Sequence, residues 1–292
     1  MKLLTYRYGE RVEIGALCPD MEHIYPLRAL GIRAETMQQL IIESDYEALR
    51  QLRMKVEAGC EEKISLAQVE LMPPIPEPRQ SVICLENNFY RDLEEKRSAV
   101  ENGTEPQWPI YYYKKATLAN KPGGEVPSYP DYAEELDTEP GVAMITAADI
   151  RAIPEEDAGK YIFGYTILNN IISRGLTKRH RRPVVSTGLD GFLPMGPWIV
   201  TADEFEENPV FHIETRINGR VVQSASMELM KFTQNHIVSD LCLYGILKSA
   251  SIIWLGTPFG CIRDQENPVY LKSGDFIECT ISGLGTLANT VK

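Results

Sequence analysis

Acidic residues gather in one short segment of the chain, at Glu134, Glu135, Asp137 and Glu139. Side chains two positions apart in an extended strand point to the same face, so Asp137 and Glu139 would lie side by side. Two carboxylates in a cleft can bind a hard divalent cation, or one of them can act as a general acid or base if burial raises its pKa. A solvated acidic loop is the alternative interpretation of the same segment.

Basic residues are concentrated in one run, Lys178-Arg179-His180-Arg181-Arg182. Such a run can steer or hold an anionic or carrier-bound substrate, or it can form a mobile, solvated loop. Arg174 and Lys114 are further candidates for holding a substrate carboxylate, and an arginine can do so through two parallel hydrogen bonds. For Arg174 the alternative is an internal ion pair.

Composition excludes several classes of protein. The chain has 292 residues, of which 43% are apolar and 24% charged, as in an ordinary globular protein. A net charge of −11 argues against a nucleic-acid partner, and the apolar runs are too short to span a membrane. The N-terminus has no long apolar segment typical of a secretory signal. Six scattered cysteines without a C-x-x-C pair favour the reduced, cytoplasmic compartment. The four histidines lack metal-ligand spacing, so a histidine-based metal site is not expected.

The elements that must position these side chains form a mixed α/β, β-dominated pattern. Residues 1–72 are predicted to form a small N-terminal α+β domain, with strands at 2–7 and 11–17 and a helix at 34–58. A proline-rich linker at 73–80 follows, because four closely spaced prolines exclude a helix or a central strand. The remaining elements fall within 81–292: strands at 81–85, 109–115, 161–170, 251–255 and 275–281, helices at 90–101, from 154 and at 230–247, and a hairpin over 211–223 turning at Asn218-Gly219.

Several motifs in sequence order resemble the fumarylacetoacetate hydrolase family. They are Ile83-Cys84-Leu85-Glu86-Asn87-Asn88-Phe89-Tyr90, Pro109-Ile110-Tyr111-Tyr112-Tyr113-Lys114, Gly164-Tyr165-Thr166-Ile167-Leu168-Asn169-Asn170 with Ser173-Arg174, Phe192-Leu193-Pro194-Met195-Gly196-Pro197-Trp198, Asn218-Gly219, Gly256-Thr257-Pro258-Phe259-Gly260 and Leu271-Lys272-Ser273-Gly274-Asp275. The resemblance implies a rolled mixed β-sheet domain at 81–292 behind the small N-terminal domain, and a homodimer. It also implies C–C hydrolysis, decarboxylation or keto–enol isomerisation of 2-oxo or 1,3-dioxo carboxylic acids. In such proteins a Mg²⁺ held by Glu-x-Glu and a later Asp chelates the substrate.

The ligand positions depart from that pattern. Counting back from Pro154 places Glu139 at the first Glu and Gly141 at the second, while Asn170 stands at the later Asp. Asn88 replaces an acidic residue that some members use, and Thr187 replaces a lysine. The lid histidine becomes Leu93, and the first Thr of the usual Thr-Gly-Thr-Pro becomes Leu255. Because amide oxygens carry no charge to offset dehydration of Mg²⁺, we expect no metal cofactor. If the register is shifted, Mg²⁺ would bind to Asp137 and Glu139.

Three hypotheses of function follow. In the first, the protein is an enzyme for a small, anionic, enolisable oxo acid or a polyketide-like substrate, working by metal-independent acid–base chemistry. The second is a catalytically silent binding or scaffold protein with the same fold. The third is a Mg²⁺-dependent C–C hydrolase with shifted ligands. The predicted catalytic residues are Glu139, Asn170 and Asn88; the predicted substrate-binding residues are Arg174, Lys114, Thr187, Tyr112 and Thr257.

Overall fold

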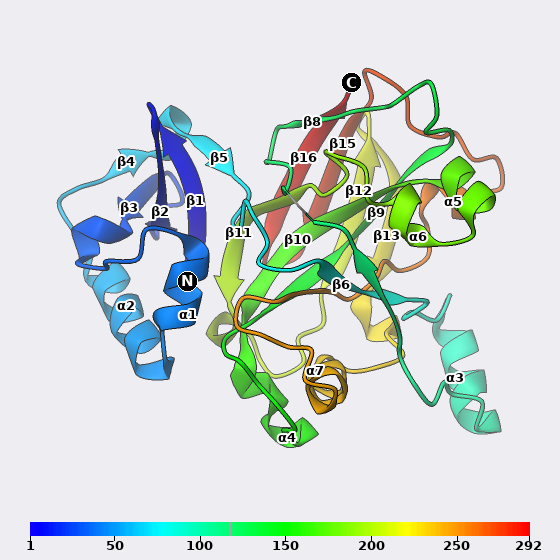
Figure 1. Cartoon of the computed structure of the whole chain (residues 1–292), viewed down its shortest axis with the longest axis horizontal. Helices are drawn as coiled ribbons and strands as arrows, with labels where there is room; N and C mark the ends of the chain where they lie inside the picture. The colour runs from blue at the N-terminus through cyan, green and yellow to red at the C-terminus, as the bar shows by residue number, and fades with distance from the viewer. Residues whose placement is uncertain (117) are drawn as a thin grey trace.

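The computed structural model describes residues 1–116 and 118–292, which build two β-sheets with helices at their ends and margins (Figure 1). The eleven-stranded mixed sheet runs in the order β4-β3-β2-β1-β11-β10-β9-β14-β6-β7, and β5 pairs with β1. The second sheet has five strands in the order β13-β12-β15-β16-β8. The mixed, β-dominated class expected from the sequence is confirmed.

The N-terminal part contains β1 (Lys2–Tyr8), β2 (Arg11–Leu17), β3 (His23–Pro26), α1 (Met37–Glu43), α2 (Tyr46–Ala58), β4 (Ile64–Ser65) and β5 (Glu70–Met72). The prediction of one helix over 34–58 was wrong, because the chain breaks at Ser44 and Asp45. The Asp45 side chain accepts a hydrogen bond from the backbone N–H of Ala48 (2.8 Å) and caps a second helix.

Residues 73–80 connect β5 to β6 without helix or strand, as their prolines require. The N-terminal strands nevertheless continue the large sheet, since β1 pairs with β11 at Lys2↔Val200 and Leu3↔Ile199. Whether 1–72 and 81–292 are separate domains stays a prediction.

The remaining strands are β6 (Val82–Glu86), β7 (Ile110–Lys114), β8 (Glu125–Val126), β9 (Leu136–Thr146), β10 (Ile162–Ser173), β11 (Met195–Thr201), β12 (His212–Ile217), β13 (Arg220–Ser226), β14 (Ile252–Trp254), β15 (Phe276–Ile281) and β16 (Gly285–Val291). The predicted hairpin is present as β12 and β13. Its turn residues Asn218 (φ 52°) and Gly219 (φ 78°) both have the positive φ that a type I′ turn requires.

The helices of this part are α3 (Leu93–Asn102), α4 (Glu155–Ala158), α5 (Arg174–His180), α6 (Pro183–Ser186) and α7 (Gln234–Leu243). The predicted helix over 230–247 is shorter than expected at both ends. Thr233 caps its start by accepting from the backbone N–H of His236 (3.1 Å), and Gly245 follows its end with φ 70°. In the part of the chain that the structure describes, no helix is both long and apolar enough to cross a bilayer.

Strands β9 and β10 form the centre of the large sheet, and every residue of both is buried. Their antiparallel register places Asn170 opposite Glu139 and Ile172 opposite Asp137. The five-stranded sheet packs against these strands, and apolar residues from both sheets, such as Met144 and Ile277, share one core cluster. This packing fixes where the polar side chains of β9 and β10 emerge.

Candidate active site

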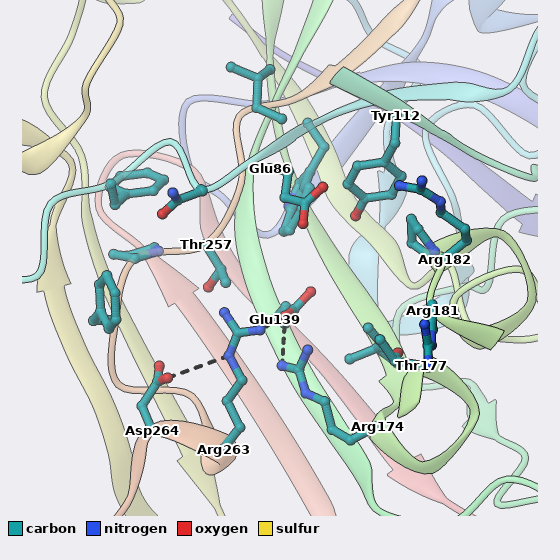
Figure 2. A pocket seen from close by; sticks show the side chains of 18 residues that line it. Glu86, Tyr112, Glu139, Arg174, Thr177, Arg181, Arg182, Thr257, Arg263 and Asp264 are labelled. Carbon is teal, nitrogen blue, oxygen red and sulfur yellow. Dashed lines mark hydrogen bonds and ion pairs between the residues drawn. The ribbon is translucent and has the colours of Figure 1, made fainter. Parts of the chain in front are cut away.

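A cavity of about 200 Å³ opens beside the first residues of β9 (Figure 2). Its wall combines charged and aromatic side chains from β6, β7, β9, the α5–α6 segment and the loop that follows β14. The lining residues are Leu85, Glu86, Asn87, Phe89, Tyr112, Glu139, Ile172, Arg174, Thr177, Arg181, Arg182, Pro183, Trp254, Thr257, Pro258, Phe259, Arg263 and Asp264. The cavity therefore brings together segments that are far apart in the sequence.

The guanidinium of Arg174 lies between two buried carboxylates, of which Glu139 lines the cavity and Asp137 lies behind its wall. Its Nε and Nη2 donate to Asp137 Oδ2 at 2.9 and 2.6 Å, and Nη2 also donates to Glu139 Oε1 at 2.6 Å. The Asp137 side chain is fully buried and that of Glu139 is 8% exposed. Because β9 places the two acids on one face, Arg174 at the start of α5 can pair with both.

Backbone donors complete the surroundings of Asp137. Its Oδ1 accepts from the N–H of Thr138 (2.8 Å) and Ile262 (3.1 Å), and its Oδ2 accepts from the N–H of Arg263 (3.3 Å). Burial raises the pKa of Asp137, an effect that the positive charge of Arg174 opposes. The charges of Glu139 and Asp137 outweigh burial at Arg174 and raise its pKa, so its guanidinium stays protonated.

Glu139 connects this ion pair to the amide of Asn170. Its Oε2 accepts from Asn170 Nδ2 at 2.6 Å, and its Oε1 lies 3.8 Å from Arg263 Nη1. Asn170 Nδ2 is also 3.4 Å from the Tyr112 hydroxyl, whose pKa is raised well above its ordinary value, chiefly by burial. The Asn170 Oδ1 atom is buried and has no hydrogen-bond partner among the described residues. The structure thus brings Glu139, Arg174, Tyr112 and Asn170 together, and it shows for Arg174 the internal ion pair that was the alternative to substrate binding. Their roles toward a substrate stay a prediction.

Four predicted site residues do not line the cavity: Asn170, which contacts Glu139, and Asn88, Lys114 and Thr187. Asn88 is buried and donates to the carbonyl of Leu255 at 2.9 Å. Lys114 is fully buried, where its amine donates to the carbonyl oxygen of Thr187. Burial lowers the pKa of Lys114 to about 7. The Thr187 hydroxyl, also buried, donates to the Pro183 carbonyl at 2.8 Å. Thr257, by contrast, lines the cavity wall.

Asp137 and Glu139 lie in the buried strand β9. The alternative interpretation of the acidic segment as a solvated loop was therefore wrong for these two residues. Gly141, the position that the sequence matched to the second acid of the family, is tightly enclosed. A Cβ atom at Gly141 would lie 2.2 Å from the Gly256 carbonyl oxygen and 2.4 Å from Trp254 Nε1. This position therefore has no room for a side chain, and the two carboxylates that share Arg174 are those of Asp137 and Glu139.

Comparison with known proteins identifies the family to which the chain belongs. The family model for the C-terminal part of fumarylacetoacetate hydrolase matches residues 81–292. The chain belongs to the fumarylacetoacetate hydrolase family. The oxaloacetate tautomerase YisK of Bacillus subtilis is 36% identical over 230 residues, covering 78% of this chain and 74% of YisK.

Solved structures of fumarylacetoacetate hydrolase family members extend the likeness to the whole chain. The fumarylacetoacetate hydrolase of Exiguobacterium antarcticum has a TM-score of 0.83 and 28% identity, covering 100% of this chain and 99% of that one. The maleylpyruvate hydrolase of Sphingobium sp. SYK-6, also covered to 99%, has a TM-score of 0.76 and 25% identity. The relatives named here are thus a tautomerase and hydrolases of small oxo acids, and the resemblance predicted from the motifs is confirmed.

The divalent cation of this family does not fit the residues present here. Both oxygens of Asp137 already accept hydrogen bonds, and the guanidinium of Arg174 lies between the two acids. Among residues 1–116 and 118–292, no three His, Cys, Asp or Glu side chains are grouped to hold a metal ion. A metal would have to displace Arg174 and would find only two carboxylates.

Sequence reasoning missed Arg263, Asp264, Glu86 and Trp254, which also line the cavity. Arg263 pairs with Asp264 (3.4 Å) as well as approaching Glu139. The motif Gly256–Gly260 was recognised, but nothing in it signals that a charged side chain three residues later faces the acidic pair.

Proposed function

We propose that this protein is an enzyme that interconverts the keto and enol forms of a small 2-oxo carboxylic acid, by acid–base chemistry without a resident divalent cation. One observation carries the proposal: the Arg174 guanidinium lies between Asp137 and Glu139 on the cavity wall, within 2.6 Å of an oxygen of each acid. A fixed positive charge is thereby present where the oxygen of an enolate would need one.

The proton transfer would balance within the site. The C–H bond next to the oxo group breaks, its proton passes to Glu139, and the electron pair forms the C=C bond of the enolate. Arg174 and Arg263 stabilise the negative charge that develops on the oxygen. Glu139 then returns the proton to that oxygen, so that the substrate is isomerised without loss or gain of atoms. Asn170 holds the carboxylate of Glu139 in place through its 2.6 Å hydrogen bond.

The test is oxaloacetate keto–enol interconversion, followed by the ultraviolet absorbance of the enol in buffer treated with EDTA. We expect turnover above the buffer rate, and a loss of about 10²–10⁴-fold in kcat for Glu139→Gln. Glu134→Gln is the matched control, because Glu134 is exposed and lies outside the cavity wall. Undiminished turnover by Glu139→Gln would contradict the role given to Glu139.

Metal dependence separates the remaining hypotheses. Activity that EDTA abolishes and Mn²⁺ or Mg²⁺ restores would favour a metal-dependent hydrolase with Asp137 and Glu139 as ligands. No turnover of oxaloacetate or of 1,3-dioxo acids, with or without metal, would favour a binding or scaffold protein. A cytoplasmic homodimer stays our expectation, which light scattering of the purified protein and cell fractionation can test.

A further inference from the structure

Four arginines line the cavity, and two of them form no ion pair with an acidic residue in the described part of the chain. Arg174 is paired with Asp137 and Glu139, and Arg263 with Asp264. Arg181 and Arg182 also line the cavity, and both are exposed. Within the part of the chain that the structure describes, neither forms an ion pair or a side-chain hydrogen bond with another residue.

The backbone at Arg181 is in a conformation that this residue type rarely adopts. Arg181 has φ 56° and ψ 12°, and its N–H donates to the Thr177 carbonyl at 2.7 Å, so it ends α5 in the left-handed region. Glycine and asparagine are the usual residues there, because a Cβ atom is strained at positive φ. Strained residues of this kind are frequent at functional sites.

The two arginines lie on one side of the cavity. In Figure 2, Arg181 and Arg182 lie on the side formed by α5 and α6, Arg263 lies on the opposite side, and Glu139 with Arg174 is between them. Three carboxylates line the cavity. Glu139 is paired with Arg174 and Asp264 with Arg263, which leaves Glu86 as the lining carboxylate without an ion pair among the described residues. Two positive charges thus face one unpaired carboxylate, and this side of the cavity attracts anions in a chain whose net charge is −11.

We propose that Arg181 and Arg182 form a second anion subsite, which binds a carboxylate at the far end of the substrate from the reacting oxo group. This inference rests on the proposed function and narrows the substrate class to small oxo dicarboxylates. The cavity of about 200 Å³ agrees with a short molecule, since sites for drug-sized ligands hold about 300–1,000 Å³. Lys178 of the same basic run is paired with Glu135 (2.6 Å) and is not part of the subsite.

The decisive variant is Arg181→Gly, because it removes the guanidinium and at the same time relieves the strained backbone. We expect the preference for oxaloacetate over a monocarboxylic 2-oxo acid, in kcat/KM, to fall at least tenfold. The melting temperature should stay equal or rise, which a merely structural role of Arg181 would not produce. Arg179→Ala is the matched control, since Arg179 is exposed in the same run but does not line the cavity. An unchanged preference in Arg181→Gly overturns the subsite.

Binding without turnover keeps this test independent of the proposed reaction. Malonate should raise the melting temperature of the unmodified protein, acetate at the same ionic strength should not, and Arg181→Gly and Arg182→Ala should each lose the effect of malonate. That pattern supports the subsite even if oxaloacetate is not turned over, in which case only the proposed reaction fails. Equal effects of malonate on all variants overturn it. Stabilisation by inorganic phosphate and not by malonate would overturn the carboxylate assignment and identify a phosphate group as the anion.

Discussion

Replacing Arg174 by methionine tests the electrostatic core of the site. The change keeps most of the side-chain volume but leaves Asp137 (fully buried) and Glu139 (8% exposed) without their shared cation. Breaking a buried ion pair by removing one partner typically costs about 3–5 kcal/mol of unfolding free energy, because an uncompensated charge stays in the protein. That corresponds to a change of about 10²–10⁴-fold in the unfolding equilibrium constant.

Urea unfolding at neutral pH in EDTA, followed by tryptophan fluorescence and circular dichroism, measures this cost. The matched control is Arg50→Met, which removes the exposed pair of Arg50 with Glu47 and should cost less than about 1 kcal/mol. A triple variant with Asp137→Asn, Glu139→Gln and Arg174→Met should regain most of the lost stability, since no buried charge is left unpaired.

A divalent cation provides the second measurement on Arg174→Met. Removing the guanidinium leaves two carboxylates on one face and the unpartnered Oδ1 of Asn170 beside them. We therefore expect millimolar Mn²⁺ to stabilise this variant and to leave the unmodified protein unaffected. If Arg174→Met costs no more than Arg50→Met, or if Mn²⁺ stabilises both proteins equally, the idea that Arg174 takes the place of a metal is refuted.

Two further predictions concern residues behind the cavity wall. The buried Lys114 has a pKa lowered to about 7 from its ordinary 10.5, so between these values the unfolded chain binds more protons than the folded one. Stability should therefore rise by about 2 kcal/mol between pH 6 and 8.5 relative to Lys114→Met, and urea unfolding at both pH values measures the difference. Gly141→Ala should lower the unfolding free energy by about 1–3 kcal/mol, because the new methyl group meets the Gly256 carbonyl oxygen. If Gly141→Ala has the same unfolding free energy as the unmodified protein, β9 can shift to make room for a side chain, and this prediction is wrong.

Much of the fold could be predicted because its signals are local. The apolar, β-branched segments, the proline-rich connection and the Asn218-Gly219 turn each depend on a few neighbouring residues. The break between α1 and α2 also had a local signal, the capping residue Asp45, which the periodicity of the flanking apolar residues concealed. The presence of a strand, turn or linker could therefore be predicted where a few neighbouring residues determine it. The first and last residues of the elements were predicted less well.

The site was predictable only in part because its contacts are long-range. The pairing of Asp137 with the backbone N–H of Arg263 joins residues 126 positions apart, and no sequence pattern reports such a contact. Lys114 shows the opposite failure: its charge suggested a ligand for substrate, but β7 points it into the interior toward the Thr187 carbonyl. Residue type alone could not distinguish a charged group that faces a cavity from one that is buried behind it.

The charges around Glu139 connect two features of the site: asparagine at position 170, where the family resemblance implies an acid, and Arg174 between the two remaining acids. Asp137, Glu139 and Asp264 contribute three negative charges, and the guanidinium groups of Arg174 and Arg263, which pair with them, offset two. A carboxylate at position 170, where the family resemblance implies Asp, would add a further negative charge that only a further cation could balance. With asparagine there, the side chain donates to Glu139 instead of repelling it. The two guanidinium groups therefore leave one net negative charge among these five residues, and an acid at position 170 would double it.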